Sequence, residues 1–214
     1  MIAGVKLDQN APPLEVDPLV NRNNKTILER YIFAAHWCKG KKVLDSSCGY
    51  GYGSAILKAL GANTVTGTDI DDEALEFCKE NHVGCGFSKM DLTKRIGNGY
   101  PVFDVVVSIE TMEHLPKDDV EVYLRNLKRC LKRGGKLIVT TPVRREMKFN
   151  YKGGTHLYEY NEAEFRHLIN LLFTDVKYMS LVEFRCFKDG LLHSELINDI
   201  TKDSRLFFAV CTKQ

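Results

Sequence analysis

The sequence has no apolar run long enough to cross a membrane, and its N-terminal segment, MIAGVKLDQNAPPLEVDP, lacks the apolar core of a secretory signal. It also lacks a C-x-x-C pair among its seven cysteines. Cys78, Cys130 and Cys211 fall in apolar-periodic segments, where a small buried thiol is expected. These absences argue against a membrane-spanning protein and against a disulfide-stapled secreted one. We therefore expect a reduced, cytoplasmic protein.

An excess of charge of one sign is also missing. Lys and Arg number 30 against 28 for Asp and Glu, which gives a net charge of +2 and no general attraction to nucleic acid or anionic lipid. The chain shows no internal repeat and no low-complexity segment. With 214 residues, of which 44% are hydrophobic, it is long enough for one well-buried core and short for two. We expect a single domain that spans residues 1–214.

Short β-rich runs alternate with helical ones along most of the chain, which predicts a doubly wound α/β fold with a mostly parallel sheet covered on both faces. The expected helices are residues 24–38, the segment from the glycine loop to about Leu60, residues 72–81, Asp118 to Lys132, and Glu162 to Leu172. We expect Gly134 and Gly135 to terminate the helix that begins at Asp118. The expected strands are KKVLDSS, TVTGTDI, CGFSKMD, FDVVVSIE and KLIVTTP, followed late in the chain by DVKYMSLVEF and RLFFAVCTK.

The segment VLDSSCGYGYGSAIL leads from the first strand through Gly49, Gly51 and Gly53 into a helix. Such a loop presents free backbone N–H groups, and glycines let a ligand approach the main chain closely. The loop lacks the Gly-Lys-Ser/Thr of a phosphate-binding P-loop. It also reads G-x-G-x-G, whereas dinucleotide-dependent dehydrogenases carry G-x-G-x-x-G. Asp45, just before the loop, would oppose a pyrophosphate but suits a ligand with a cationic amine.

An acidic residue follows each of the first three expected strands. Asp69, at the end of the second, is positioned to accept both ribose hydroxyls of an adenosine. Asp91, after the third, is placed to meet the exocyclic amine of an adenine. Together with Asp45, these acids favour an adenosine-containing ligand with a positively charged group.

The segments VLDSSCGYGYGSA, VTGTDIDDEAL, KMDL, FDVVVSIETMEHL and LKRGGKLIVTTP follow one another between Lys41 and Pro142. They resemble, in order, the motifs of the class I S-adenosylmethionine-dependent methyltransferases. One departure is the run Ser46-Ser47-Cys48, where the family commonly has smaller or glycine-containing residues. The resemblance implies a seven-stranded sheet with an antiparallel last strand, and S-adenosylmethionine across the carboxyl ends of the first strands.

The resemblance also assigns parts of the chain. It implies an N-terminal helical segment over the site (residues 1–40), a cofactor-binding core (41–142), and an acceptor loop with the last helix and strands (143–214). The cofactor-binding residues that it implies are Asp45, Cys48, Gly49, Gly51, Gly53, Asp69, Ile70, Asp91, Leu92 and Ser108.

The segment SIETMEHL carries Glu110, Glu113 and His114 at the end of the fourth expected strand. If a helical turn begins there, residues at i, i+3 and i+4 share one face. Two carboxylates and an imidazole suit Mg²⁺, Mn²⁺ or Zn²⁺, and His156, beyond the fifth strand, is a candidate fourth ligand at the same rim of the sheet. We expect Glu110, Glu113 and His114 to be catalytic. In the alternative without a metal, His114 is the general base.

The Glu-x-x-Glu-His pattern with a distant His resembles two metal-assisted branches of the family, the ubiquinone-pathway O-methyltransferases and the small-RNA 2′-O-methyltransferases. The substrates of both branches present two adjacent oxygens, and a bound cation that chelates such a pair lowers the pKa of the hydroxyl. We expect O-methylation of a small-molecule or glycan acceptor with neighbouring hydroxyls. The alternatives are 2′-O-methylation of a nucleic-acid end, which the absence of a basic stripe disfavours, and a non-catalytic cofactor-binding partner subunit. The oligomeric state stays open, a homodimer included.

Overall fold

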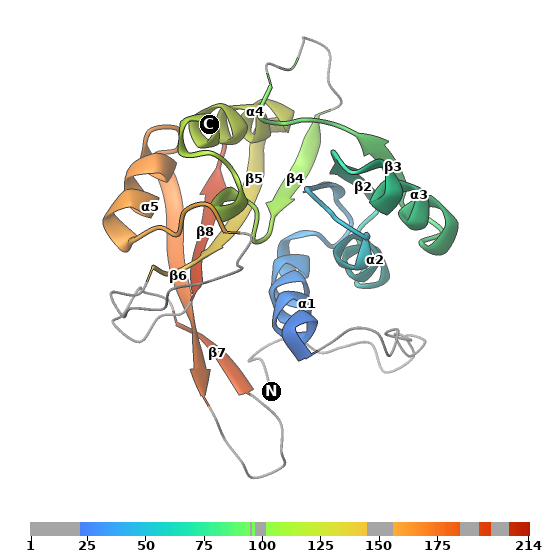
Figure 1. Cartoon of the computed structure of the whole chain (residues 1–214), viewed down its shortest axis with the longest axis horizontal. Coiled ribbons are helices and arrows are strands. Elements are labelled where there is room, and N and C mark those ends of the chain that lie inside the picture. Colours follow the sequence, from blue (N-terminus) through green and yellow to red (C-terminus); the bar gives the residue numbers. More distant parts are fainter. Residues whose placement is uncertain (1–21, 95, 97–101, 145–155, 185–192, 198–205) are drawn as a thin grey trace.

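The structure is a computed structural model and describes residues 22–94, 96, 102–144, 156–184, 193–197 and 206–214 (Figure 1). Residues 1–21 of the expected N-terminal segment and residues 145–155 of the expected acceptor loop lie outside the described residues. In the described part of the chain, no helix has both the length and the apolar character that a membrane span requires.

One sheet organises the described residues, with strand order β3-β2-β1-β4-β5-β8-β6-β7 (Figure 1). The seven expected strands are present. The pairs among β1 to β5 are parallel, and β8 runs antiparallel to both β5 and β6, which confirms the expected α/β fold and its antiparallel last strand. β7 adds a short edge strand, antiparallel to β6. The strands are β1 (Lys42–Ser46), β2 (Thr64–Asp69), β3 (Gly86–Lys89), β4 (Phe103–Ser108), β5 (Leu131–Pro142), β6 (Asp175–Phe184), β7 (His193–Ile197) and β8 (Leu206–Thr212).

Helices cover both faces of the sheet, because its strands bury side chains on both sides. Along β8, the side chains of Phe207, Ala209 and Cys211 join the core under α4 and α5, whereas those of Phe208 and Val210 join the core under α1 and α2. The period of two is that of a strand buried on both faces. The helices are α1 (Arg22–Ala34), α2 (Tyr52–Ala59), α3 (Asp72–Asn81), α4 (Val120–Cys130) and α5 (Glu162–Asn170), with 3₁₀ turns η1 (Ala35–Trp37), η2 (Met112–His114) and η3 (Lys117–Asp119).

The strand order places the candidate site. From β1 the chain winds outward through β2 to β3, and it then returns to add β4 on the other side of β1. The carboxyl ends of β1 and β4 therefore lie at a topological switch point, where open α/β sheets bind their ligands. The glycine loop follows β1, and the segment with Glu110, Glu113 and His114 follows β4, so both candidate motifs meet at this edge.

The expected end of the fourth helix was wrong by two residues. α4 ends at Cys130, and the next residue, Leu131, already pairs with Phe103 of β4. The register then shifts, and pairing resumes at Lys136. Gly134 takes a φ of +75° in this irregular part of β5 and donates its N–H to the carbonyl of Lys213 at 2.7 Å. The glycines thus shape a bulge in the strand and do not terminate the helix.

The three glycines of the loop have different structural roles. A Cβ on Gly53 would lie 2.1 Å from Cζ of Tyr31, and a Cβ on Gly51 would lie 2.7 Å from Sγ of Cys78. These two glycines are needed for packing against α1 and α3. Gly49, with a φ of +52°, has no atom within 4 Å of the position of a Cβ, and it is the one of the three that leaves open space beside the backbone.

We expect Gly53→Ala to lower the free energy of unfolding by about 1–3 kcal/mol, because the added methyl group overlaps the Tyr31 ring. Helix propensity alone predicts the opposite sign, since alanine is favoured over glycine by about 1 kcal/mol inside a helix. Urea denaturation measures the change. In a Tyr31→Ala background the same substitution should cost less than about 0.5 kcal/mol; an equal cost in both backgrounds would contradict the contact.

Candidate active site

The carboxyl ends of β1, β2 and β3 carry the acids that the sequence singles out. Asp69, at the end of β2, accepts hydrogen bonds from three backbone N–H groups: Gly49 N to Oδ2 at 2.8 Å, and Ile70 N and Asp71 N to Oδ1 at 2.7 and 3.1 Å. The bond from Gly49 ties the glycine loop to β2. The Ile70 side chain beside it is 63% exposed, which is unusual for a large apolar residue and leaves a surface for a planar ligand group.

Asp91, after β3, is exposed and accepts from the N–H and the hydroxyl of Thr93, at 2.9 and 2.6 Å. The hydroxyl bond of Thr93 contributes most to the lowered pKa of this carboxyl, which keeps it ionised. Together with Asp69, Ile70 and the open side of Gly49, Asp91 provides the acceptors and the close backbone approach that an adenosine moiety requires. Their binding roles stay predictions.

Asp45 lies deeper than its position in the motif suggests. It is fully buried, and its oxygens accept from the hydroxyls of Tyr31 (3.0 Å to Oδ1) and Ser54 (2.6 Å to Oδ2). Burial raises the pKa of Asp45 to about 7, against the two hydrogen bonds, which lower it. The carboxyl therefore links α1 and α2 to β1, and its contact with a ligand amine stays a prediction.

Three other expected cofactor residues are also buried. The hydroxyl of Ser108 lies 2.8 Å from the Tyr123 hydroxyl, inside the core. The Leu92 side chain packs in the core under α4. Burial raises the pKa of the Cys48 thiol, so the thiol stays protonated. These three side chains are buried, so they pack beneath the surface of the site.

The second residue after β4 determines how the Glu-x-x-Glu-His segment is arranged. Ile109 is followed by Glu110 with a φ of +49°, a left-handed conformation that is uncommon outside glycine, and the 3₁₀ turn η2 begins only at Met112. Glu110 therefore does not belong to the same helical turn as Glu113 and His114. The helical spacing assumed from the sequence holds for the last two residues alone.

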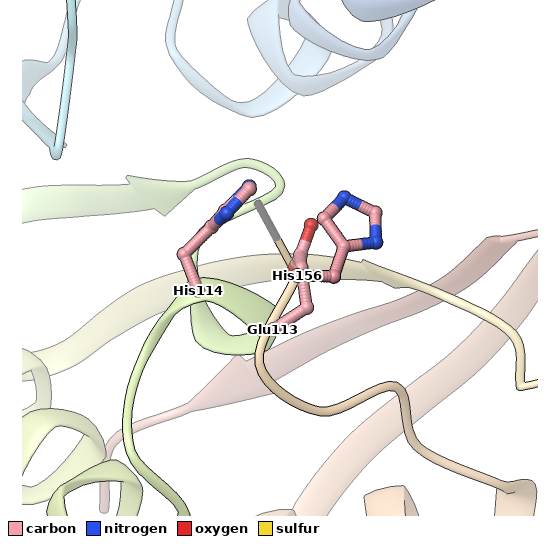
Figure 2. A group of neighbouring side chains, drawn as sticks. All are labelled: Glu113, His114 and His156. Carbon is pink, nitrogen blue, oxygen red and sulfur yellow. The ribbon is translucent and has the colours of Figure 1, made fainter. Parts of the chain in front are cut away.

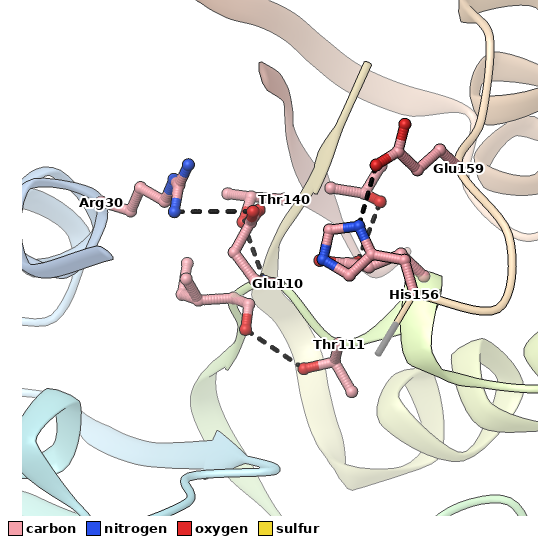
Figure 3. Close-up of polar contacts among 9 residues, drawn as sticks. Arg30, Glu110, Thr111, Thr140, His156 and Glu159 are labelled. Carbon is pink, nitrogen blue, oxygen red and sulfur yellow. Dashed lines mark hydrogen bonds and ion pairs between the residues drawn. The ribbon is translucent and has the colours of Figure 1, made fainter. Parts of the chain in front are cut away.

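Glu110 is held by α1 and β5 (Figure 3). Arg30 Nη1 of α1 lies 3.5 Å from Glu110 Oε2, and the hydroxyl of Thr140 donates to Oε1 at 3.0 Å. The same Thr140 oxygen accepts from the backbone N–H of Glu110 at 3.2 Å. Burial raises the pKa of Glu110, whereas the Arg30 charge opposes that shift. Glu110 thus sits at the contact between the N-terminal helix and the site.

Glu113 is fully buried and only half satisfied. Its Oε2 accepts from the hydroxyl of Thr141 at 3.0 Å, while Oε1 has no hydrogen-bond partner among the described residues. Burial and the neighbouring Glu110 charge raise the pKa of Glu113 to about 8. An unpartnered buried carboxylate oxygen is costly unless a cation or a proton accompanies it. This oxygen is the best evidence in the site for a missing positive group.

Two imidazoles lie beside Glu113 (Figure 2). One ligand atom each from Glu113, His114 and His156 lies within 4.8 Å of the others, and the two rings meet edge to face with centroids 4.8 Å apart. His156 Nδ1 lies 2.8 Å from Oε1 of Glu159 (Figure 3). A neutral His156 that donates from Nδ1 carries its lone pair on Nε2, and such carboxylate–histidine pairs are common around protein-bound metals.

The position of His156 depends on its neighbours in the chain. The carbonyl of Glu113 accepts from Leu157 N at 2.7 Å and from Tyr158 N at 3.1 Å, and Tyr160 forms a bridge to Val143 at the end of β5. This segment is therefore fixed against η2. The structure brings together three of the four expected metal ligands, Glu113, His114 and His156, and leaves Glu110 outside that group.

The donor set fits a divalent cation. It offers two imidazole nitrogens and the carboxylate of Glu113, of which one oxygen has no partner among the described residues. Two nitrogen ligands favour Zn²⁺ or Mn²⁺ over Mg²⁺, which prefers oxygen and retains several waters. The sequence reasoning missed Arg30, Thr140, Thr141 and Glu159, which hold these ligands in place.

A cavity of about 720 Å³ lies elsewhere, between α4 and the end of α5. Its walls include Lys128 and Lys213, but these ammonium groups donate to the carbonyls of Leu172 and Leu131, which follow the ends of α5 and α4. They act as caps of helix C-termini. This cavity therefore does not compete with the strand-end site as the candidate active site.

The comparisons with known proteins identify the kind of domain. Residues 44–139 match the family model described as "Methyltransferase domain". Over 147 residues, the chain is 31% identical to a ubiquinone biosynthesis O-methyltransferase from Coxiella burnetii; the match covers 67% of this chain and 57% of that protein. The chain spans between 35% and 57% of the length of the curated relatives that it matches.

Solved structures show the same fold. A methyltransferase from Archaeoglobus fulgidus superimposes with a TM-score of 0.68 at 18% identity, covering 89% of this chain and 94% of that one. The magnesium protoporphyrin IX methyltransferase from Synechocystis with bound SAH gives 0.63 at 16% identity, covering 90% and 84%. The chain belongs to the class I S-adenosylmethionine-dependent methyltransferases.

We expect Glu113→Gln to change the pH dependence of stability in chelator-treated protein. A carboxyl whose folded pKa of about 8 exceeds its ordinary value of 4.5 destabilises the fold increasingly as pH rises between those values. The effect approaches about 1.4 kcal/mol per pH unit. Urea titrations from pH 5 to 8 should therefore show a flatter slope for the variant. Exposed Glu121→Gln is the matched control, and an unchanged slope in Glu113→Gln would refute the buried, unpaired state.

Proposed function

We propose that this protein methylates an oxygen of a small-molecule or sugar acceptor with neighbouring hydroxyls, assisted by a divalent cation at Glu113, His114 and His156. The observation that carries the proposal is the buried, unpartnered Oε1 of Glu113 within a group whose ligand atoms lie within 4.8 Å of one another. A general base alone does not require this arrangement, whereas a cation bound there would offset the cost of burying the carboxylate.

The chemistry divides between the cofactor and the chain. When bound, S-adenosylmethionine supplies a methyl group on a sulfonium that is already a good leaving group. The protein must hold the acceptor in line and help its hydroxyl to lose a proton. In this proposal the glycine loop with Asp69 and Asp91 binds the cofactor, and the segment after β4 binds the acceptor. The two lie side by side because β1 and β4 are neighbours at the switch point.

The residues around the candidate metal site have separate tasks in this proposal. Glu113, His114 and His156 would hold the cation, which would supply Lewis acidity toward a hydroxyl. Glu159 orients the His156 ring through Nδ1. Glu110, paired with Arg30, stays outside the metal set and lines the side toward α1. Without a cation, His114 is the side chain in this group best suited to accept the acceptor proton.

The relatives support an oxygen acceptor without defining it. Their names include a ubiquinone biosynthesis O-methyltransferase and a fatty-acid O-methyltransferase, but also a ribosomal protein L11 methyltransferase. The vicinal oxygens are inferred from the metal site, because a cation with free coordination positions chelates adjacent hydroxyls.

Methyl transfer from labelled S-adenosylmethionine to catechols, free sugars, nucleotide sugars and short RNAs tests the activity. We expect transfer to a vicinal-diol or catechol acceptor, its loss with a chelator, and its return with Zn²⁺ or Mn²⁺. Transfer that ignores the chelator would remove the cation from the proposal and leave His114 as the base. Transfer to RNA ends alone would favour 2′-O-methylation, and bound cofactor without any transfer would favour a non-catalytic subunit.

Metal binding is measurable without an acceptor. By calorimetry with Zn²⁺ or Mn²⁺, we expect His156→Ala and Glu113→Ala to weaken binding at least tenfold, and Glu159→Gln to weaken it about tenfold through the His156 ring. His36→Ala, which removes an exposed imidazole of η1, is the matched control and should bind as the unaltered protein does. Equal affinities in all four proteins would show that the group binds no metal.

A further inference from the structure

We propose that His82 is a positioning residue for the cofactor, because it and Cys78 fix the orientation of two successive peptide groups in the glycine loop. The inference rests on the cofactor class of the family and is independent of the metal and of the acceptor. It concerns α3, which carries none of the residues that the motif analysis assigned to the site.

Two side chains of the α3 segment bond to the loop. Cys78 Sγ donates to the carbonyl of Gly49 at 3.3 Å, and His82 Nε2 lies 2.8 Å from the carbonyl of Tyr50. A carbonyl only accepts, so Nε2 carries the proton. Residues four apart lie on the same face of a helix. Cys78 and His82, the residue directly after α3, therefore contact consecutive carbonyls of the loop.

Aromatic neighbours hold the His82 ring in place. Its centroid lies 5.4 Å from that of Tyr52, 6.0 Å from that of Phe77 and 6.2 Å from that of Phe87. A Cβ on Gly51 would lie 2.8 Å from Cδ2 of His82. A side chain at position 51 would therefore overlap the imidazole as well as the Cys78 thiol.

The hydrogen bonds determine where the loop N–H groups point. In a trans peptide, the C=O and the following N–H point in opposite directions. With the Gly49 carbonyl directed toward α3, the N–H of Tyr50 points away from α3. Within the described residues this N–H has no acceptor, and the space beside Gly49 is open. The next peptide, whose Tyr50 carbonyl contacts His82, has its Gly51 N–H bonded to the carbonyl of Cys48 at 3.0 Å. The free donor therefore belongs to the peptide that Cys78 orients, and the His82 bond steadies the adjoining peptide on which its direction depends.

Loss of the His82 hydrogen bond should therefore change the affinity for the cofactor more than it changes the stability of the fold. The His82 hydrogen bond is exposed, so its loss changes the free energy of unfolding little. Its loss does free the loop, and a ligand must then order the loop as it binds. One hydrogen bond of about 1 kcal/mol corresponds to roughly a fivefold change in the dissociation constant.

The test uses S-adenosylhomocysteine as the probe, titrated calorimetrically in the presence of a chelator. His82→Phe keeps an aromatic ring and removes the donor, whereas His82→Gln places an amide N–H near the position of Nε2. His36→Phe is the matched control, since His36 is also exposed and packs edge to face on an aromatic ring, with its centroid 5.1 Å from that of Trp37.

We expect His82→Phe to raise the dissociation constant about three- to tenfold, His82→Gln to recover most of that loss, and His36→Phe to bind normally. The ligand-free midpoints of thermal unfolding should agree within about 2 °C. In ¹⁵N-labelled ligand-free protein, the Tyr50 and Gly51 amide resonances should shift in His82→Phe and return in His82→Gln.

Normal affinity in His82→Phe would overturn the proposal, and so would an equal loss in both His82 variants together with a lowered midpoint. Since neither metal nor acceptor is present, these results are separate from those for the proposed function.

Discussion

The cofactor side of the site depends on one buried carboxyl group. Asp45 lies one residue before the end of β1 and accepts from Tyr31 of α1 and Ser54 of α2, so two helices are fixed near the strand end by a single residue. The Tyr31 ring then fills the space where a Cβ of residue 53 would lie, which makes glycine obligatory there. The next residue back along α1 is Arg30, which reaches Glu110. The packing of one helix against Asp45 thus also sets the charge balance on the acceptor side.

The two carboxyls on the acceptor side, Glu110 and Glu113, differ in their charged neighbours. Thr140 and Thr141 are successive residues of β5, and each donates a hydroxyl to one glutamate, Glu110 and Glu113 respectively. Successive side chains of a strand point to opposite faces, so the two carboxyls are held on different sides of β5. Glu110 has the Arg30 charge as a partner, whereas burial and the Glu110 charge raise the pKa of Glu113 to about 8. Among the described residues, Glu113, which has two imidazoles beside it, is therefore the one of the two carboxyls whose oxygen is left without a partner.

The sequence predicted those features of the molecule that depend on periodicity and on strand order. Alternating elements identified the parallel sheet, and acids after successive strands marked its carboxyl edge, because parallel strands bring those ends together. His156 was found by the same argument. The sequence could not show that Glu110 would take a φ of +49°, since its neighbours carry no glycine or proline signal for that turn. Ser47 is a comparable case, with a φ of +55° at a position where the family commonly has smaller or glycine-containing residues. Arg30, Thr141 and Glu159 escaped notice because each is an ordinary residue whose role depends on a contact with a distant segment.

The two halves of the site are joined by neutral groups. The hydroxyl of Tyr123 lies 2.9 Å from that of Ser46 at the end of β1 and 2.8 Å from that of Ser108 at the end of β4. All three residues are buried, and burial raises the pKa of the Tyr123 hydroxyl, so the network carries no charge at neutral pH. Hydrogen-bonded hydroxyls can join two strand ends without the desolvation cost of a buried ion pair. The carboxyls of Asp69 and Asp91 on one side, and of Glu113 on the other, take no part in this network. We expect them to act instead on ligands, Asp69 and Asp91 on the cofactor side and Glu113 on the acceptor side.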